Sequence, residues 1–329
     1  MTTASSGLLG VTDPALQASV GAGLAQVEDR LREVVVSSHP LLTSAAAHLV
    51  DAGGKRFRPL LTLLAAHLGD PTRPQVVDAA VVVELTHLAT LYHDDVMDEA
   101  PVRRGAESAN TRWTNTVAIL TGDYLFARAS DLTAGLGTEA TRLQSRTFAR
   151  LVEGQIAETA GPAAGVDPVA HHLQVLADKT ASLISTSARL GALMAGAPAD
   201  VVETVAAYGE VIGVAFQLSD DLIDVLSDAG ESGKTPGTDL REGIATLPVL
   251  LARADGDTSL LAALEADLST DAALSDALRL LRGHPAMEQA RARLESYVAQ
   301  ARTVASELPA GPPREALLAL ADYVLERTG

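Results

Sequence analysis

Six aspartates form two clusters whose spacing is typical of a shared metal site. They are Asp94, Asp95, Asp98, Asp220, Asp221 and Asp224. Each cluster closes an apolar stretch with helical periodicity, so its first and last carboxylates lie one turn apart on one helix face. Three acids in one turn repel each other and oppose the helix dipole, but a hard cation such as Mg²⁺ reverses that effect. We therefore predict a Mg²⁺ site built from both clusters.

The alternative is that the acids are ordinary solvated helix ends. A single acidic helix end is weak evidence for metal, because such ends are common on protein surfaces. Two clusters with the same spacing, each at the end of an apolar run, favour metal binding. A purely structural role would leave the repulsion among the six acids unexplained.

Basic residues gather at positions that suit an anion such as diphosphate. A turn at Gly53–Gly54 precedes Lys55 and Arg58, and its free N–H groups and cations could cradle phosphate oxygens. Arg103 and Arg104 follow the first aspartate cluster closely enough to contact the same anion. The alternative is a basic loop that only neutralises an acidic surface.

Four further residues stand out by their surroundings. Lys179 and Thr180 lie among apolar and small residues, where a lone lysine is costly unless it is paired or functional. Lys234 follows the second cluster in a glycine-containing loop that could close over the site as a lid. His87 lies two turns before the first cluster on nearly the same face, although a lone histidine there is more often packed in the core.

Composition limits the classes of protein that fit this chain. Its 329 residues include 25 basic and 42 acidic side chains, for a formal net charge of −17, which argues against nucleic acid as a partner. The absence of cysteine excludes disulfides and thiolate metal sites and fits a cytoplasmic location. Residues Met1 to Val11 lack signal-peptide features, and no charge-free apolar run reaches the ~20 residues of a membrane span. We expect a soluble protein without a transmembrane segment.

Apolar residues spaced three and four apart predict helices throughout the chain. The first begins after Asp13–Pro14, and the others span roughly 41–52, 58–69, 74–98, 115–135, 139–160, 168–195, 200–226, 244–254 and 316–327. Glycine and proline mark the breaks, and no stretch alternates like a strand. We therefore expect a disordered N-terminus at residues 1–12 and one all-α domain at 13–329, with both aspartate clusters lining a central cavity.

The motifs together resemble the trans-isoprenyl diphosphate synthase, or polyprenyl synthetase, family from about Leu49 to Leu250. The matching stretches are Gly53 to Arg58, Asp94 to Asp98, Arg103 to Gly105, Phe216 to Asp224, Gly233–Lys234, Gly237 to Leu240 and Thr246 to Pro248. Residues Gly105 to Ser108 depart from the family, which commonly has a proline and a threonine there, so the shape of that loop stays open. The resemblance implies an isoprenoid-synthase-type helical bundle and a homodimer.

The same resemblance implies a magnesium-dependent prenyl transferase that joins isopentenyl diphosphate to an allylic diphosphate. Three Mg²⁺ ions on the six aspartates would hold the allylic diphosphate, with Arg103, Lys179 and Lys234 completing its binding. The residues implied for isopentenyl diphosphate are Lys55, Arg58, His87 and Arg104. Thr180 and Gln217 would line the allylic site, and Gln155 and Glu158 are a further polar pair facing the metals. The implied catalytic residues are Asp94, Asp95, Asp98, Arg103, Lys179, Asp220 and Lys234.

Two residues just before the first cluster bear on product length. Ala89 and Thr90 have small side chains where short-chain members of the family carry bulky aromatics. In those members the aromatics act as a floor that blocks further growth of the product chain. The resemblance is therefore strongest to long-chain synthases that make quinone tails, whose product would pass to a membrane. The alternatives are a short-chain geranylgeranyl or farnesyl diphosphate synthase, in which Ala89 only permits close helix packing, and a non-catalytic partner subunit. Partner subunits usually lose the aspartate motifs, and terpene cyclases replace the second one with Asn, Ser/Thr and Glu.

Overall fold

The computed structural model describes residues 12–227 and 236–328, and these residues are almost entirely helical. The first part contains α1 (Pro14–Val34), α2 (Pro40–Asp51), α3 (Phe57–Ala66), α4 (Gln75–Met97), α5 (Ala109–Arg112), α6 (Asn115–Leu136) and α7 (Thr138–Ala160). It continues with α8 (Pro168–Leu176), the π-helical turn η2 (Ala177–Ala181), α9 (Ser182–Met194) and α10 (Ala199–Leu226). After the gap come α11 (Thr238–Arg241), α12 (Leu247–Asp255), α13 (Thr258–Leu264), α14 (Asp271–Arg282), α15 (Pro285–Ser306) and α16 (Pro312–Glu326). The prediction of an all-α fold is confirmed.

Several helices begin where the sequence supplies a capping side chain. Asp13 accepts a hydrogen bond from the Leu16 amide at 2.8 Å, directly before Pro14 in the first turn of α1. Asp167 caps α8 in the same way. A capping carboxylate satisfies an amide that has no partner inside the helix, and a proline at the first position loses no hydrogen bond. These local signals explain why the predicted starts of both helices agree with the structure.

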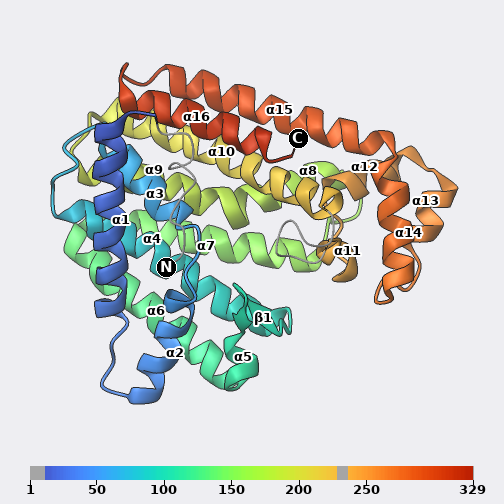
Figure 1. Cartoon of the computed structure of the whole chain (residues 1–329), viewed down its shortest axis with the longest axis horizontal. Coiled ribbons are helices and arrows are strands. Elements are labelled where there is room, and N and C mark those ends of the chain that lie inside the picture. The colour runs from blue at the N-terminus through green and yellow to red at the C-terminus, as the bar shows by residue number, and fades with distance from the viewer. Residues whose placement is uncertain (1–11, 228–235, 329) are drawn as a thin grey trace.

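The long helices pack side by side into a bundle with α10 near its middle (Figure 1). The helices α15 and α16 cover one side of α10, and α9 covers another. On the other half of the bundle, α4 packs against α3, α6 and α9. Both α4 and α10 are long and apolar enough to cross a membrane, but most of each is buried inside the protein, as in the core helices of soluble folds.

Two features of the fold were not predicted. The helices α13, α14 and α15 fall in a region for which the sequence analysis named no helix. A short hairpin, β1 (Val102–Arg103) and β2 (Ala106–Glu107), stands where no strand was expected. Its two central residues, Arg104 and Gly105, both have positive φ, at 54° and 76°. Tight two-residue hairpin turns require that backbone conformation, so Gly105 gives the loop its shape without the family's usual proline.

Close helix crossings depend on glycine. At Gly191 in α9, an added Cβ atom would overlap the backbone carbonyl of Thr62 in α3. The two backbones can therefore approach only because no side chain separates them. By contrast, a Cβ atom added at Gly21, in the middle of α1, would have no neighbouring atom within 4 Å.

We predict that Gly191→Ala destabilises the protein by about 1 to 3 kcal/mol, because backbone atoms cannot move aside as a flexible side chain can. Gly21→Ala is the matched control and should be neutral or stabilising by up to about 1 kcal/mol, since alanine favours the helix. Urea unfolding of both variants measures the difference. Equal stability of the two variants would contradict the proposed role of the α3–α9 crossing.

Candidate functional site

The first aspartate cluster lies at the C-terminal end of α4, as predicted. Asp95 is fully buried, and its Oδ1 atom accepts a 2.6 Å hydrogen bond from Arg103 Nε on the hairpin. The other oxygen, Oδ2, is buried without a hydrogen-bond partner in the described structure. Asp94 is half-buried, and Asp98 is exposed at the helix cap. The end of this apolar helix therefore carries negative charge that its own surroundings only partly neutralise.

The pKa of Asp94 reflects this crowding. Burial and the nearby Asp98 carboxylate raise the pKa of Asp94 to about 6, and the opposing effects of Lys179 and Arg103 are too small to cancel that rise. Burial also raises the pKa of Asp95, against the opposing effect of Arg103. A carboxyl whose charged form is disfavoured gains from a neighbouring cation. The end of α4 is thus electrostatically suited to a positively charged ligand.

The second cluster lies at the C-terminal end of α10, and other parts of the chain supply a polar partner to each of its acids. Asp220 forms an ion pair with Arg327, which directly follows α16. Asp221 is buried, and its Oδ2 atom lies 3.1 Å from Nε2 of His172. Asp224 accepts hydrogen bonds of 3.1 and 3.2 Å from the first two amides of α11. This helix end is more completely compensated than the first one.

The π-helical turn η2 lies between the two clusters. Lys179 forms an ion pair with Glu158 of α7 and is close enough to Asp94 to lower its pKa. The next residue, Thr180, donates a 3.4 Å hydrogen bond to Oε1 of Gln217 in α10. Single π-helical turns inside α-helices occur frequently at functional sites. Here the turn directs two successive side chains toward different helices.

Two glycines allow this turn to sit tightly between its neighbours. An added Cβ at Gly154 of α7 would lie 2.6 Å from the Lys179 amide nitrogen. An added Cβ at Gly213 of α10 would lie 2.6 Å from Cα of Ala181. The backbone of η2 is therefore held from both sides, which fixes the positions from which Lys179 and Thr180 project.

The predicted anion-binding residues form a cationic cluster around His87, two turns before Asp94 on α4. Burial lowers the pKa of Arg58 to about 10, and repulsion from Arg104 adds to that effect. Burial and four arginines, first among them Arg58, lower the pKa of His87 well below its usual range. His87 is therefore neutral at physiological pH and can donate a hydrogen bond without adding charge. Lys55 is exposed in the turn just before this cluster.

The carboxylate of Glu84, which was not predicted as a site residue, offsets this positive charge. Glu84 of α4 is almost fully buried and lies 2.8 Å from Arg56 Nη1 and 3.5 Å from Arg104 Nη2. Arg104 also donates hydrogen bonds to the carbonyls of Leu49 and Gly53. A lone glutamate in an apolar helix, one turn before His87, was a signal for this role, because such a side chain is rarely buried unless paired.

The two residues expected to set product length have different surroundings. Ala89 is fully buried, and its carbonyl oxygen faces Gly122 where α4 and α6 cross. Thr90 is half-buried and lies about 40° from Asp94 around the α4 axis. The hydroxyl of Thr90 donates to the His87 carbonyl at 2.7 Å. The close crossing at Ala89 fits the alternative that this alanine permits helix packing, whereas Thr90 shares the face of the carboxylate.

The structure thus places the predicted residues in local groups, with Arg103 and Lys179 near Asp94 and with Arg58 and Arg104 near His87. Lys234 lies outside the described residues. Within residues 12–227 and 236–328, no three acidic or histidine side chains already converge as a ready metal site. The donor set nevertheless fits a divalent cation, because Asp95 has a buried oxygen without a partner and the charged form of Asp94 is disfavoured.

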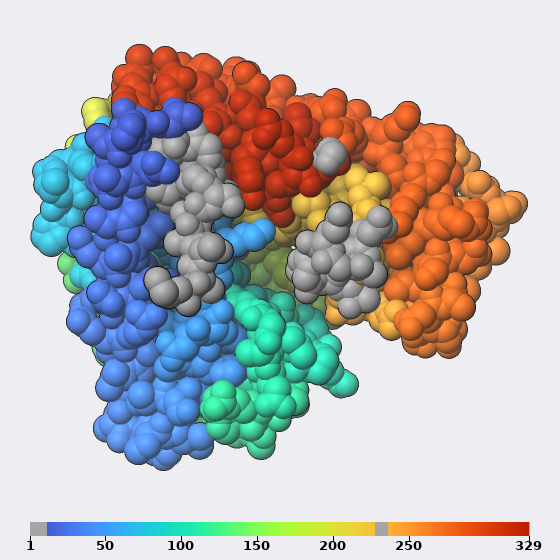
Figure 2. Space-filling view, viewed as in Figure 1, coloured from blue at the N-terminus to red at the C-terminus, as the bar shows by residue number. Residues whose placement is uncertain are grey.

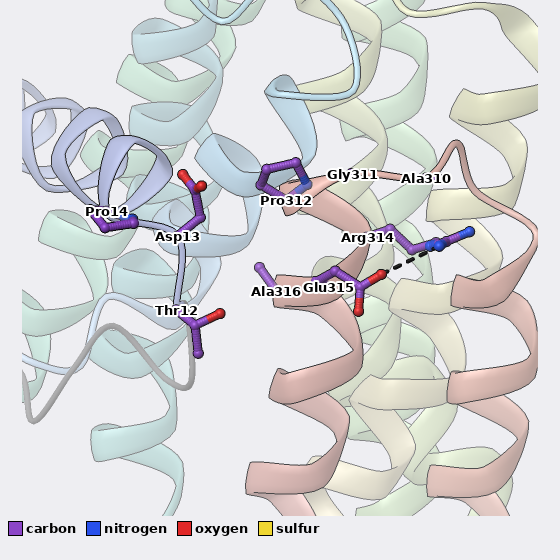
Figure 3. A pocket seen from close by; sticks show the side chains of 9 residues that line it. All are labelled: Thr12, Asp13, Pro14, Ala310, Gly311, Pro312, Arg314, Glu315 and Ala316. Atoms are coloured by element: carbon purple, nitrogen blue, oxygen red, sulfur yellow. Dashed lines mark hydrogen bonds and ion pairs between the residues drawn. The ribbon is translucent and has the colours of Figure 1, made fainter.

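The surface is hollowed near the centre of the face seen in Figure 2, above the teal segment that holds the hairpin. A separate pocket of about 550 Å³ lies between the start of α1 and the start of α16, and Figure 3 shows its lining. None of the predicted site residues lines it. We therefore assign no part of the aspartate site to that pocket.

Comparison with known proteins gives one consistent family. A family model described as polyprenyl synthetase matches residues 39–281. A nonaprenyl diphosphate synthase from Mycobacterium tuberculosis is 47% identical over 321 residues, covering 96% of each chain. A dimethylallyltranstransferase from the same organism is 42% identical, covering 95% of this chain and 96% of its own. Component 2 of a heptaprenyl diphosphate synthase from Geobacillus stearothermophilus is 35% identical, covering 92% and 95%.

Solved structures of similar sequence have the same fold. A decaprenyl diphosphate synthase from Rhodobacter capsulatus is 37% identical with a TM-score of 0.87, over 96% of this chain and 99% of its own. A geranylgeranyl pyrophosphate synthase from Corynebacterium glutamicum is 42% identical with a TM-score of 0.86, over 97% and 99%. The latter was solved with calcium and isoprenyl diphosphate. Divalent cations and isoprenyl diphosphate thus occur together in a protein of this fold.

We predict that Asp94→Asn stabilises the cation-free protein in a pH-dependent way. Because the pKa of Asp94 is raised from 3.8 to about 6, the folded state binds more protons than the unfolded state between these values, and stability falls as pH rises. The substitution should therefore raise the free energy of unfolding by up to about 3 kcal/mol at pH 8, and by about half of that at pH 5.

Urea unfolding in the presence of a chelator measures this effect. Asp29→Asn is the control, since the Asp29 side chain is 82% exposed on α1. A gain for Asp94→Asn that is the same at both pH values, or matched by the control, would contradict the assigned environment of Asp94.

Proposed function

Since this chain belongs to the polyprenyl synthetase family and is a prenyltransferase, we propose that it makes a long-chain all-trans polyprenyl diphosphate. It would join isopentenyl diphosphate to an allylic diphosphate and repeat the step on the lengthened product. The observation that carries this proposal is the arrangement of opposite charges along α4, which ends in aspartates and is contacted around the neutral His87 by arginines from other elements. Asp94 and His87 lie seven residues apart, or about 10 Å along the axis.

The side chains have roles that suit this reaction. Asp94, Asp95, Asp98, Asp220, Asp221 and Asp224 would hold three Mg²⁺ ions, which when bound stabilise negative charge on the departing diphosphate. Arg103, Lys179 and Lys234 would bind the same diphosphate directly. Fixed cations in such a site stabilise charge that develops in the transition state more than charge already present in the substrate.

The second substrate would bind at the other charge cluster. Lys55, Arg58, Arg104 and the neutral His87 would hold isopentenyl diphosphate close to the allylic carbon. The C–O bond between that carbon and its diphosphate breaks, and the double bond of isopentenyl diphosphate forms the new C–C bond. A proton then leaves for the departed diphosphate. Thr180 and Gln217, joined by a hydrogen bond of 3.4 Å, would line the allylic site.

The interior below Asp94 supports a long product. Thr90, Val83 and Ala79 continue the Asp94 face of α4 within about 60° around the helix axis. Ala79 and Val83 belong to an apolar cluster that also contains Leu183 and Leu190 of α9. The buried side chains of this cluster are small or aliphatic, although Phe148 packs against it, and they would yield to a growing hydrocarbon chain more readily than an aromatic floor.

A second pocket lies at the start of α4, beside the same apolar cluster. Its volume is about 280 Å³, and the residues that line it are Arg73, Gln75, Leu136, Leu193 and Met194. Gln75 begins α4, nineteen residues before Asp94, which corresponds to about 28 Å along the helix axis. The names of the relatives favour the long product, since nonaprenyl, heptaprenyl and decaprenyl synthases are among them, although a geranylgeranyl synthase is also 42% identical. The small side chains of Ala89 and Thr90, at positions where short-chain members of the family carry aromatic residues, also favour the long product.

Self-association is a further part of the proposal. The exposed faces of α6 and α7 carry large apolar side chains, namely Ile119, Leu120, Val152 and Ile156. Apolar side chains grouped on neighbouring helices are typical of protein interfaces. We propose that a second copy of the chain covers this surface in a cytoplasmic homodimer. A different partner subunit is the alternative, because one relative is named as component 2 of a synthase.

Product analysis tests the proposed reaction. The purified protein is incubated with Mg²⁺, isopentenyl diphosphate and farnesyl diphosphate, and the products are sized by mass spectrometry. We expect a ladder that ends at heptaprenyl diphosphate or beyond. Asp94→Ala should lower turnover by about 10²-fold or more, whereas Asp29→Ala, on the surface of α1, should not.

Each other outcome has a defined meaning. Products that stop at geranylgeranyl diphosphate would keep the chemistry and reject the long chain. No elongation by the wild-type protein would favour the partner-subunit alternative. Normal turnover by Asp94→Ala would reject the metal role of the first cluster.

We predict that Thr90→Phe shortens the product, because an aromatic ring on the Asp94 face would block the path at its start. Thr90→Ser is the matched control and should leave the product length unchanged. Ala89→Phe should also shorten the product if that residue forms part of the floor, although its buried position makes it the more disruptive change. A full-length ladder from folded Thr90→Phe would remove Thr90 from the path.

A further inference from the structure

The last described turn of the chain reaches the second aspartate cluster. Arg327 forms an ion pair with Asp220, and the two side chains are 11% and 32% exposed. The guanidinium also lies over the ring of Phe216, one turn before Asp220, at 4.6 Å from the ring centroid. A cation on the face of an aromatic ring is attracted to it, and partial burial strengthens both contacts.

Rigid elements hold Arg327 in this position. The Tyr208 hydroxyl of α10 donates a buried 2.7 Å hydrogen bond to the Leu317 carbonyl of α16. Asp220 follows Tyr208 by twelve residues, and Arg327 follows Leu317 by ten, so α16 runs alongside α10 in the same direction (Figure 1). Arg291 of α15 donates a 2.9 Å hydrogen bond to the carbonyl of Thr328. The register of α16 on α10 thus presents the guanidinium to Asp220.

The contact also reaches toward the cationic cluster. Phe216 stacks on Phe57, at 4.8 Å between ring centroids, and Phe57 directly precedes Arg58. Among the described residues, the side-chain hydrogen bond of Arg327 is the one to Asp220, and its Nη1 atom is buried without a partner there. The guanidinium could therefore move away from Asp220 without leaving a second hydrogen-bond partner unsatisfied.

A divalent cation and a guanidinium cannot both contact this carboxylate without strong repulsion. Two positive charges a few ångströms apart at a partly buried site repel each other more than they would in bulk water, because they are screened less. Cation binding at Asp220 must therefore displace Arg327 or overcome that repulsion. The arginine and the cation are linked as competitors, and each weakens the binding of the other.

We propose that Arg327 is a built-in counter-ion of Asp220 that holds the second aspartate cluster in the cation-free enzyme and competes with the divalent cation for it. The proposal rests on the metal role of Asp220 within the proposed function. It makes Arg327 a positioning residue whose removal strengthens cation binding, the opposite of what loss of a ligand would do.

Mn²⁺ binding to the full-length protein without substrates tests the competition. Free Mn²⁺ is followed by electron paramagnetic resonance for the wild type, Arg327→Gln and the charge-retaining Arg327→Lys. Arg302→Gln is the control, since Arg302 pairs with Asp322 and its side chain is 56% exposed on α15. We expect Arg327→Gln to bind Mn²⁺ about fivefold tighter or more, and the other two variants to stay within about twofold of the wild type.

Thermal unfolding gives a second readout that does not depend on turnover. Arg327→Gln should melt below the wild type in chelator, and the difference should shrink at saturating Mn²⁺, because the cation stabilises the variant more. A purely structural role would leave that difference unchanged and would overturn the proposal. Equal Mn²⁺ affinity of wild type and Arg327→Gln would overturn it too.

The double variant Asp220→Asn, Arg327→Gln separates local competition from a general change in charge. The gain in Mn²⁺ affinity should disappear in the Asp220→Asn background, and a persisting gain would reject Asp220 as the shared partner. Elongation of farnesyl diphosphate by the wild type is measured in parallel. Failure of elongation rejects the proposed function, whereas normal elongation with unchanged Mn²⁺ affinity rejects only the role of Arg327.

Discussion

Like charges held close together in partly buried surroundings are the constraint on which the rest of the site depends. On α4, acids crowd the C-terminal end while arginines crowd the region around His87 two turns earlier. Each group is unfavourable alone, because burial disfavours the charged form and neighbours of the same sign add repulsion. Glu84 offsets part of the positive group, and Arg103 offsets part of the negative one. What remains uncompensated is the charge that ligands of opposite sign would neutralise.

The scaffold keeps these charges apart by packing. The backbone of η2 is confined between Gly154 and Gly213, and the Lys179 side chain that projects from it pairs with Glu158. The hairpin turn at Arg104 and Gly105 anchors its strands to α2 and to the turn at Gly53 through hydrogen bonds to carbonyl groups. Rigid supports of this kind hold side chains in their productive positions before substrate arrives, which lowers the reorganisation needed during the reaction.

Much of this site could be predicted from sequence because its signals are local. The two aspartate clusters, and the apolar helices that carry them, follow from the spacing of a few neighbouring residues, as the structure of α4 and α10 bears out. The fold class followed from the same periodicity. The cap at Asp13 and the break at Gly161 are equally local.

The remainder depends on contacts that join distant parts of the chain. Arg327 and His172, which pair with Asp220 and Asp221, lie 107 and 49 residues away from them, so no spacing rule connects these pairs. The helix α15 was overlooked because alanine covers much of its buried face, which gives a weak contrast with its charged residues. The hairpin has strands of only two residues, too short for an alternating pattern to appear.

The length of α4, which spans 23 residues, has a consequence for how such a protein can diverge. Because the reaction would take place at one end of this helix and apolar positions such as Ala79 and Val83 lie toward its other end, substitutions at those positions alter the space available without touching Glu84, His87 or the aspartates. Each residue along the helix corresponds to about 1.5 Å of depth. Mutations in this one helix could therefore change the length of the product in small steps, while the residues that carry out the reaction are selected separately.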